Sequence, residues 1–463
     1  MPTILLKPHS SQTPLAAVDD ELSALIRDRT AEDPTYWSSP DRERRDAVHA
    51  LFQYPAMMVP IVQRRLIEVV KAVQRGVVSM YDPFVGAGTA LVAGMYHGLD
   101  CYGLDINPLA LLVTRVKTGP LFLECFREAA ESVINAAIAE AAYPQPNRYL
   151  EKWFTPEVAA RLSSLQSAIR AVENRYARRF LWVTLAETTR LTSNDRTSTY
   201  KLHMRPEADI VLGRPDPLVV FQALIHQNLA DLLEHCDLLK SAHRVRNGKY
   251  CGIVRTALGD STIGAMKPIG GGRFDLVVTS PPYGDNTTTV TYGQHSYLPL
   301  QWTDFSDIDV RADPSMLRTT QEIDRQSLGG IFPKLKDERV SRVIARSPAF
   351  AQTLEALTEK REDHARRVAA YVVDLDDCLF RIASSVRRNG YLIWTIGNRC
   401  VGGIEIPNDS IIVELFQAHG VIQVTSVGRT IHSKRMAPRN GFADTMKSEE
   451  IVVFRQARKT AND

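Results

Sequence analysis

The stretch from residue 77 to residue 105 constrains the fold more than any other part of the sequence. A short apolar run, 77–81, leads into a glycine-spaced turn, and the alanine- and leucine-rich segment 90–96 follows. A second apolar run, 101–104, ends at Asp105. Strand, tight turn, helix and strand in this order are typical of a parallel α/β unit. The sequence therefore predicts an α/β fold with this unit near its start.

The turn itself, residues 82–89, reads Asp-Pro-Phe-Val-Gly-Ala-Gly-Thr. Its glycines let the backbone approach a ligand, and the helix that Thr89 opens offers unpaired N–H groups. Asp105 follows at roughly the 20-residue distance at which dinucleotide-type folds place a ribose-binding carboxylate. The spacing is not Gly-x-Gly-x-x-Gly and no phosphate-binding Lys follows, which favours a nucleoside with an uncharged linker, such as S-adenosylmethionine. An ordinary βα turn of another α/β enzyme is the alternative.

A second motif, Ser280-Pro281-Pro282-Tyr283, follows the run 274–278, which is apolar except for Asp275. Such a run is expected of a strand covered on both faces, and open α/β sheets bind ligands where such strands end. The prolines stiffen the turn and leave carbonyls that only accept hydrogen bonds. A Ser hydroxyl and a Pro carbonyl can hold both hydrogens of an NH₂ group, while Tyr283 offers a stacking face. A plain Pro-Pro turn is the alternative.

Together these motifs resemble the amino-methyltransferases of DNA, which make N4-methylcytosine or N6-methyladenine. Members of that family are similar to one another in an Asp-Pro-Phe-x-Gly-x-Gly-Thr loop and a Ser/Asn/Asp-Pro-Pro-Tyr/Phe tetrapeptide, matched here by 82–89 and 280–283. Segment 54–60 resembles the part that closes over the methionine end of the cofactor, and Gly259-Asp260 resembles the site of an acidic residue near the adenine. The resemblance covers about 49–115, 250–302 and 370–455.

The resemblance implies S-adenosylmethionine as cofactor and a base flipped out of the DNA helix as target. The implied cofactor-binding residues are Tyr54, Pro55, Asp82, Phe84, Gly86, Gly88, Thr89, Asp105 and Asp260. The implied catalytic residues are Ser280, Pro281, Pro282 and Tyr283.

Within the family, a leading Ser is more typical of N4-cytosine enzymes, so the resemblance favours cytosine over adenine. Methylation at C5 of cytosine needs a nucleophilic Cys, and the chain has no Pro-Cys dipeptide. Two further alternatives stay open: an amino-methyltransferase acting on an RNA base, and a catalytically silent DNA-binding regulatory protein.

The resemblance also implies the seven-stranded Rossmann-like methyltransferase sheet, mostly parallel with its last strand reversed. Apolar runs at 390–398, 421–427 and 450–454 are expected strands, and 371–388 and 409–419 are expected helices. The predicted organisation is an N-terminal extension (1–48), a methyltransferase core (49–115, 248–302 and 369–457), a helical insertion (116–247) and a charged insertion (303–368). Within the charged insertion, 321–326 and 334–346 are expected to form exposed helices or loops. Either insertion is a candidate target-recognition region.

Basic residues near the expected ligand edge are candidate DNA contacts. The polar segment 190–201 is rich in side chains that hydrogen-bond to base edges, and the loop 429–439 carries four Lys/Arg residues expected to meet phosphates. Solvated surface loops are the alternative. The named candidates are Arg196, Lys201, Arg399, Arg429, Lys434 and Arg435.

Composition adds limits rather than a function. The net charge of +3 over 463 residues is only mildly basic, so DNA affinity has to come from local patches. Six scattered cysteines fit thiols in a reducing compartment better than disulfides or a zinc site. No signal peptide or membrane span is recognisable, so a cytoplasmic protein without metal is expected. A restriction or defence-system partner is compatible with the resemblance, and the sequence identifies none.

Overall fold

The computed structural model describes residues 15–39, 47–139, 150–431 and 448–457. Its strands are β1 (Ser79–Asp82), β2 (Asp100–Asp105), β3 (Val245–Arg246), β4 (Lys249–Tyr250), β5 (Val254–Leu258), β6 (Phe274–Thr279), β7 (Val386–Ile396), β8 (Arg399–Val401), β9 (Ile404–Ile406), β10 (Val421–Thr430) and β11 (Ser448–Gln456).

The helices, with two short 3₁₀ segments, are α1 (Leu15–Glu32), η1 (Ala47–Ala50), α2 (Pro60–Val73), α3 (Thr89–Tyr96), α4 (Pro108–Thr118), α5 (Leu123–Ala139), α6 (Pro156–Arg170), α7 (Arg175–Thr192), α8 (Glu207–Val211), α9 (Pro217–Ser241), α10 (Tyr292–Gln301), α11 (Phe305–Ile308), η2 (Pro314–Leu317), α12 (Glu322–Gln326), α13 (Glu338–Arg346), α14 (Pro348–Lys360), α15 (Glu362–Ser385) and α16 (Asn408–Ala418).

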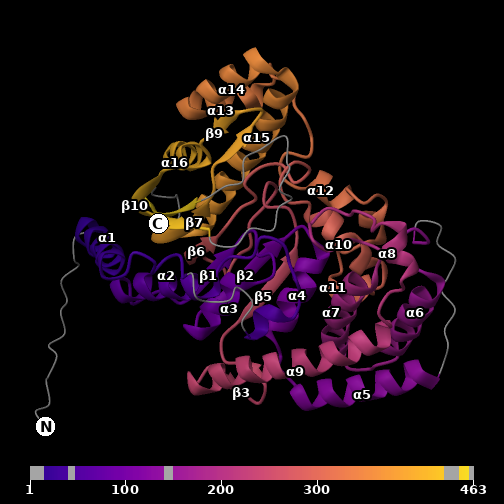
Figure 1. Cartoon of the computed structure of the whole chain (residues 1–463). Helices are drawn as coiled ribbons and strands as arrows, with labels where there is room; N and C mark the ends of the chain where they lie inside the picture. Colours follow the sequence, from indigo (N-terminus) through magenta and orange to yellow (C-terminus); the bar gives the residue numbers. More distant parts are fainter. Residues whose placement is uncertain (1–14, 40–46, 140–149, 432–447, 458–463) are drawn as a thin grey trace, which may run out of the picture.

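Seven strands form one sheet in the order β10-β11-β7-β6-β1-β2-β5 (Figure 1). The pairs β5–β2, β2–β1, β1–β6 and β6–β7 are parallel, whereas β11 runs antiparallel to both β7 and β10. The fold is thus the expected Rossmann-like α/β sheet with its last strand reversed. The strand order changes direction between β1 and β6, and such a switch point opens a crevice for ligands at the carboxyl ends of the strands.

Each face of the sheet has its own hydrophobic core. In β7, Tyr391 and Ile393 pack with helices α2 to α7 and α9 on one face, while Leu392 and Trp394 pack with helices α13 to α16 on the other. This alternation follows from the two-residue period of a strand. In Figure 1, α13–α16 gather at the top and α5–α9 lie at the lower right.

Several element boundaries differ from the sequence expectation. The helix expected over 371–388 is α15, which starts nine residues earlier and ends before Val386. The strand expected from 390 begins at Val386, because that buried residue already pairs with Phe274 of β6. Partner strands thus decide where the helix stops, which local propensity does not reveal.

The charged segment 303–368 is less exposed than its composition suggests. Val340 and Val343 of α13, and Phe350, Leu354 and Leu357 of α14, are buried in the core that covers one face of the sheet. These residues recur at helical spacing, so the apolar stripe is present in the sequence but is diluted by charged neighbours. The expectation of an exposed helix or loop over 334–346 was therefore wrong for α13, where Val340 and Val343 are buried.

The segment between β2 and β5 is helical, as expected, and it joins the main core. Leu162, Leu165 and Ile169 of α6 are fully buried and share one cluster with Phe180 of α7 and Leu91 of α3. This apolar stripe of α6 is therefore packed in the protein interior. The expected segment 1–48 contributes α1, whose Leu22 and Ile26 are buried in the same cluster.

The charged exception in β6, Asp275, ties three strands together. Its Oδ2 accepts hydrogen bonds from the backbone N–H of Val78 (3.0 Å) and from the N–H and hydroxyl of Ser79 (both 2.9 Å), and its Oδ1 pairs with Arg387 of β7. Burial alone would raise the pKa of this carboxyl, but these hydrogen bonds outweigh burial and lower the pKa.

We predict that Asp275→Ala lowers the free energy of unfolding by about 2–4 kcal/mol at pH 7, because donors of Val78 and Ser79 lose their partner. Since the folded-state pKa is depressed, the stabilisation is complete above the unfolded pKa and is lost as pH falls through the folded one. Urea unfolding at pH 7 and pH 3.5 measures both effects. Asp237→Ala, at an exposed carboxylate, is the control. Equal stability of Asp275→Ala and the parent would contradict this prediction.

Candidate active site

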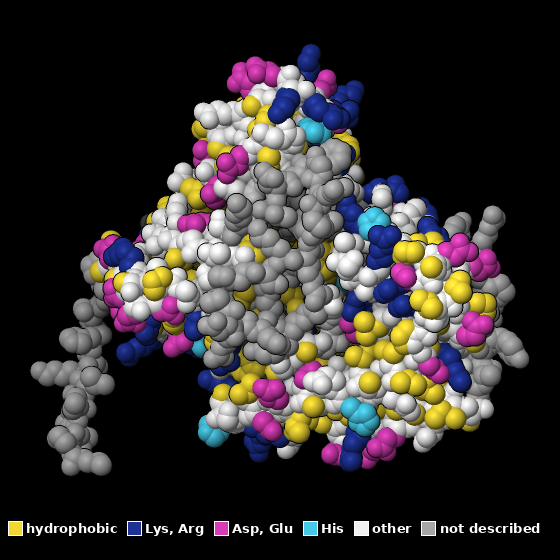
Figure 2. Space-filling model, in the orientation of Figure 1, with side chains coloured by type: hydrophobic (Ala, Val, Ile, Leu, Met, Phe, Trp, Pro, Cys, Tyr) yellow, Lys and Arg dark blue, Asp and Glu magenta, His cyan; other side chains and the backbone are white. Residues whose placement is uncertain are grey.

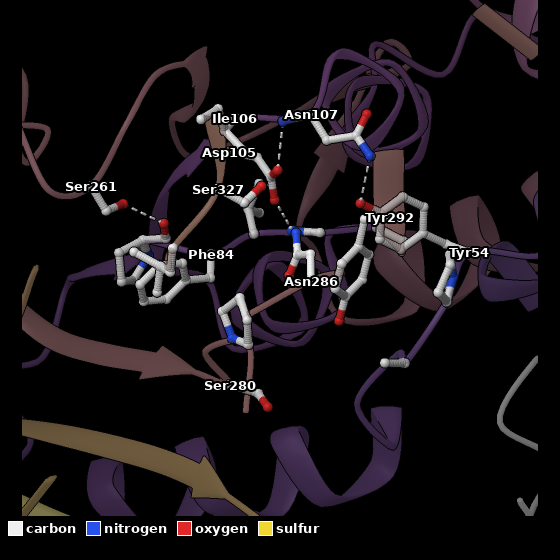
Figure 3. Close-up of a pocket in the computed structure, with 18 of the residues that line it drawn as sticks. Tyr54, Phe84, Asp105, Ile106, Asn107, Ser261, Ser280, Asn286, Tyr292 and Ser327 are labelled. Atoms are coloured by element: carbon white, nitrogen blue, oxygen red, sulfur yellow. Dashed lines mark hydrogen bonds between the residues drawn. The ribbon is translucent and has the colours of Figure 1, made fainter. Parts of the chain in front are cut away.

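A cavity lies at the carboxyl ends of β1, β2, β5 and β6 (Figure 3). The space between its walls, with the open mouth included, is about 860 Å³. Its lining brings together residues from both sequence motifs. The lining residues used below are Tyr54, Pro55, Phe84, Gly86, Thr89, Asp105, Asn107, Asp260, Ser261, Ser280, Pro282, Asn286 and Tyr292.

Asp105, at the end of β2, holds the glycine turn in place. Its Oδ2 accepts a hydrogen bond from the backbone N–H of Gly86 (2.7 Å), and its Oδ1 accepts one from the N–H of Asn107 (2.8 Å). Burial raises the pKa of this carboxyl to about 6, and those backbone hydrogen bonds oppose the rise. Lone pairs of the same carboxylate remain for the hydroxyl groups of a ribose.

The two glycines of the turn lie in close packing: Gly86 lines the cavity, whereas Gly88, expected from the sequence to bind the cofactor, does not. Gly86 and Gly88 both have positive φ, at 49° and 78°. A Cβ on Gly88 would lie 2.9 Å from the side chain of Thr114, and one on Gly86 would face the ring of Tyr54. The hydroxyl of Thr114 also donates to the carbonyl of Gly86 (2.8 Å). The cradle that these residues form fits a nucleoside cofactor, and Thr89 then opens α3 beside it.

Asp82 joins the two motifs. Its Oδ1 accepts a hydrogen bond from the hydroxyl of Thr279 (2.6 Å), which directly precedes Ser280, and another from the N–H of Phe84 (3.0 Å). Burial raises the pKa of Asp82 to about 7, and the bond from Thr279 counters part of that rise. Its Oδ2 is buried and has no hydrogen-bond partner in the described part of the chain. Asp82 does not line the cavity, so it acts as a brace between β1 and β6.

Tyr54 forms one wall of the cavity. Its hydroxyl accepts a hydrogen bond from Nδ2 of Asn107 (3.1 Å), and its ring lies 5.8 Å from that of Tyr292. Asn107 also donates to Ser296 (2.8 Å) and caps α4 by accepting from Leu109. The sequence analysis missed Asn107, although Asn followed by Pro at a helix start is a recognisable capping signal.

Asn286 is a second polar wall residue that sequence reasoning missed. Its Oδ1 is buried at the cavity without a hydrogen-bond partner among the described residues. Asp324 of α12 lies behind it, and this carboxylate accepts from the backbone N–H of Gly293 (2.8 Å) and Gln294 (3.1 Å). A buried carbonyl oxygen without a partner can accept a hydrogen bond from a ligand. No local pattern marks Asn286, because its partners are distant in the sequence.

Asp260 and Ser261 follow β5 at another side of the cavity. The carboxylate of Asp260 is occupied by its own turn, since it accepts from the N–H and hydroxyl of Thr262 (both 2.8 Å). Ser261 donates to the carbonyl of Pro83 (2.7 Å) and so fixes the neighbouring loop. The expected place of Asp260 beside the cofactor turn is thus seen, while its role toward an adenine stays a prediction.

The loop 280–283 is held rigidly from behind. Tyr371 of α15 donates to the carbonyl of Pro282 (2.7 Å), and Asn408 of α16 donates to the carbonyl of Tyr283 (3.0 Å). Ser280 and Pro282 line the cavity, whereas Pro281 and Tyr283 do not. The hydroxyl of Tyr283 bonds to Ser280 (3.0 Å) and donates to Glu449 of β11 (3.0 Å). Stacking of Tyr283 on a base stays a prediction.

The structure changes the position expected for several basic residues. Arg429 belongs to β10 rather than to a loop, is almost fully buried, and pairs with Glu449 (3.2 Å). Arg190 is buried in α7 beside Glu187, which removes it from the segment expected to meet DNA. Arg429 is in a strand because β10 pairs with residues 448–450 of β11. Arg190 is buried because α7 packs into the core.

The other candidate DNA contacts lie in varied surroundings. Arg399 pairs with Asp285 (3.6 Å) and hydrogen-bonds to Thr288 (3.3 Å). Arg196 is exposed and donates to the carbonyl of Met204, while Lys201 is half-buried. Lys434 and Arg435 lie outside the described residues. On the face in Figure 2, basic and acidic side chains are interspersed, most visibly around α13 and α14 at the top.

The side chains and helices of the described residues bear on metal binding and on membrane insertion. They contain no cluster of three or more His, Cys, Asp or Glu side chains that could hold a metal ion. Among the same residues, no helix has the length and apolar character that crossing a membrane requires.

The chain is similar over nearly its full length to a curated protein. It is 29% identical over 462 residues to the type II methyltransferase M.MvaI of Kocuria varians, covering 94% of this chain and 96% of that protein. No model of a known protein family matches the chain.

Two solved structures of the rRNA methyltransferase aviRa from Streptomyces viridochromogenes were also found. They cover 88% and 87% of this chain, and 89% and 87% of their own, at 11% and 12% identity and a TM-score of 0.28 in both cases. Likeness at this level does not bear on the reaction or the substrate.

We predict that affinity for S-adenosylmethionine falls as pH drops below about 6. The pKa of Asp105 is raised to about 6, so protonation removes an acceptor that the N–H of Gly86 and a ribose both need. The loss approaches tenfold per pH unit if the protonated form does not bind. Calorimetry between pH 5 and pH 8 measures it. Asp105→Asn should bind weakly at every pH. If the affinity of Asp105→Asn falls with pH as that of the parent does, the pH dependence belongs to another group, such as Asp82.

Proposed function

We propose that this protein transfers a methyl group from S-adenosylmethionine to the exocyclic amino nitrogen of a flipped base in DNA, N4 of cytosine being favoured. DNA as substrate is supported by the similarity to a type II methyltransferase. The preference for cytosine rests on Ser280 at the head of the Pro-Pro-Tyr loop. Methylation of adenine N6, or of an RNA base, remains an outcome of the test.

One observation carries the proposal: Ser280 and Pro282 share a cavity with Gly86, Asp105 and Tyr54. The second motif therefore opens into the space that the first motif shapes for a nucleoside. A base entering from DNA would meet Ser280 first by its polar edge. The proposal includes flipping of the target base, since a base has to leave the duplex to enter an enclosed pocket of this kind.

The reaction asks for positioning more than for acid–base chemistry. S-adenosylmethionine, when bound, supplies an electrophilic methyl group on its sulfonium. Ser280, which lines the cavity, would accept a hydrogen bond from the target NH₂ and so aim the nitrogen lone pair, whereas Pro281, the second acceptor expected from the sequence, does not line the cavity. As positive charge develops on the nitrogen, the Ser280 acceptor stabilises it. Tyr371 and Asn408, by bonding to the loop 280–283, keep Ser280 in place.

We predict that Ser280→Ala lowers kcat for DNA methylation by roughly one to two orders of magnitude while cofactor affinity stays within about twofold. Transfer of labelled methyl groups into DNA and into RNA, followed by mass spectrometry of the nucleosides, identifies the substrate and the modified atom. The expected product is N4-methylcytosine in DNA.

A matched control is Ser315→Ala, a capping-region serine in η2 outside the cavity, which should keep the parent rate. 5-Methylcytosine as product would contradict the amino-group mechanism. Label found in RNA alone would contradict DNA as substrate. Absence of transfer to either nucleic acid, with cofactor still bound, would point to the silent regulatory alternative.

A further inference from the structure

A chain of polar contacts leads from Ser280 into the interior, away from the cavity. Ser280 Oγ lies 3.0 Å from the hydroxyl oxygen of Tyr283, and that hydroxyl lies 3.0 Å from Oε1 of Glu449. The other carboxylate oxygen of Glu449 lies 3.2 Å from Nη1 of Arg429. The four residues come from the loop after β6 and from the neighbouring strands β10 and β11, which are brought together only by the fold.

The protons available to Ser280, Tyr283 and Glu449 fix which group donates in each of these hydrogen bonds. A carboxylate has no proton, so the hydroxyl of Tyr283 donates to Glu449. Tyr283 has no second proton, so at the other contact its oxygen accepts and the hydroxyl of Ser280 donates. The lone pairs of Ser280 then remain for the cavity. Burial, and next the charge of Glu449, raise the pKa of Tyr283 well above its usual value, so the phenol keeps its proton.

The direction matters for an amine that acts as nucleophile. A serine hydroxyl that could rotate freely would also be able to donate to the amino nitrogen and occupy the lone pair that attacks the methyl group. A hydroxyl whose proton is already given to Tyr283 can only accept from the N–H of the target. The lone pair of the nitrogen then stays free for the reaction.

Resting on the proposed function, we propose that Glu449 is a positioning residue that acts through Tyr283 to hold Ser280 as a hydrogen-bond acceptor for the target amino group. Arg429 completes the arrangement by pairing with Glu449, and it is almost fully buried. Arg429 of β10 would thus support the loop 280–283 through Glu449 instead of contacting a DNA phosphate. It also gives the hydroxyl of Tyr283 a task that is separate from stacking by its ring.

Tyr283→Phe isolates the hydroxyl, because the ring and its stacking face are kept. We expect kcat for DNA methylation to fall about tenfold, the equivalent of one net hydrogen bond. KM for DNA and affinity for S-adenosylmethionine should stay within about twofold, since neither depends on the direction of the Ser280 hydroxyl. Thermal unfolding and calorimetry with S-adenosylmethionine show that the variant is folded and binds.

A double-mutant cycle tests whether Tyr283 acts through Ser280. In the Ser280→Ala background, Tyr283→Phe should cause no further loss of kcat, because no hydroxyl is left to orient. Glu449→Gln, which can still offer a carbonyl oxygen to the phenol, should retain more activity than Glu449→Leu. The control is Glu450→Gln: this neighbour packs over Gly428 on the opposite face of the strand, and the variant should keep the parent rate.

The outcomes separate this proposal from the proposed function. A Tyr283→Phe variant with the kcat of the parent would overturn the orientation role, and so would a loss that persists undiminished in the Ser280→Ala background. Failure of the parent protein to methylate DNA or RNA would instead overturn the proposed function. Equal activity of Glu449→Leu and the parent would show that the carboxylate is not needed.

Discussion

The hydrogen bond between Asp82 and Thr279 is the contact on which the site depends most. It joins the ends of β1 and β6 at 2.6 Å, at the place where the strand order of the sheet changes direction. One end leads into the glycine turn and the other into Ser280. Because both loops start from this braced pair, the distance between a cofactor and a target base is set by the sheet and not by flexible loop conformations.

Buried carboxylates hold the rest of the cavity in the same manner. Asp105 accepts from Gly86 and Asn107, and Asp324 accepts from Gly293 and Gln294. Burial disfavours the charged form of both and raises the pKa of each to about 6, so keeping them ionised at neutral pH costs folding free energy. In return, the backbone N–H groups of the loops are fixed before any ligand binds. This preorganisation suits a reaction whose main requirement is alignment.

The sequence predicted those parts of the site that local sequence patterns mark. The glycine turn, Asp105 and Ser280 were found because each directly follows an apolar strand, and strand ends meet at one edge of a parallel sheet. Asn286 and Tyr292 were missed because their partners, Asp324 of α12 and Tyr54, are distant in the sequence. Arg429 was assigned to a loop because nothing local shows that β10 continues to Thr430; the pairing with Ser448 decides it.

Gln53 is one of the residues that connect the helical insertion to the wall of the cavity. The N–H of Gln53 donates to Glu187 (3.4 Å), and its side-chain oxygen accepts from Arg190 (3.1 Å), both in α7; its carbonyl lies 2.8 Å from Nε2 of His295. Glu187 and Arg190 form a buried ion pair, whose rigidity is its main benefit, since burying two charges rarely adds stability. The next residue is Tyr54, a wall of the cavity. The insertion therefore supports the cofactor wall from behind, and a segment expected to face DNA becomes, in α7, part of the scaffold that shapes the site.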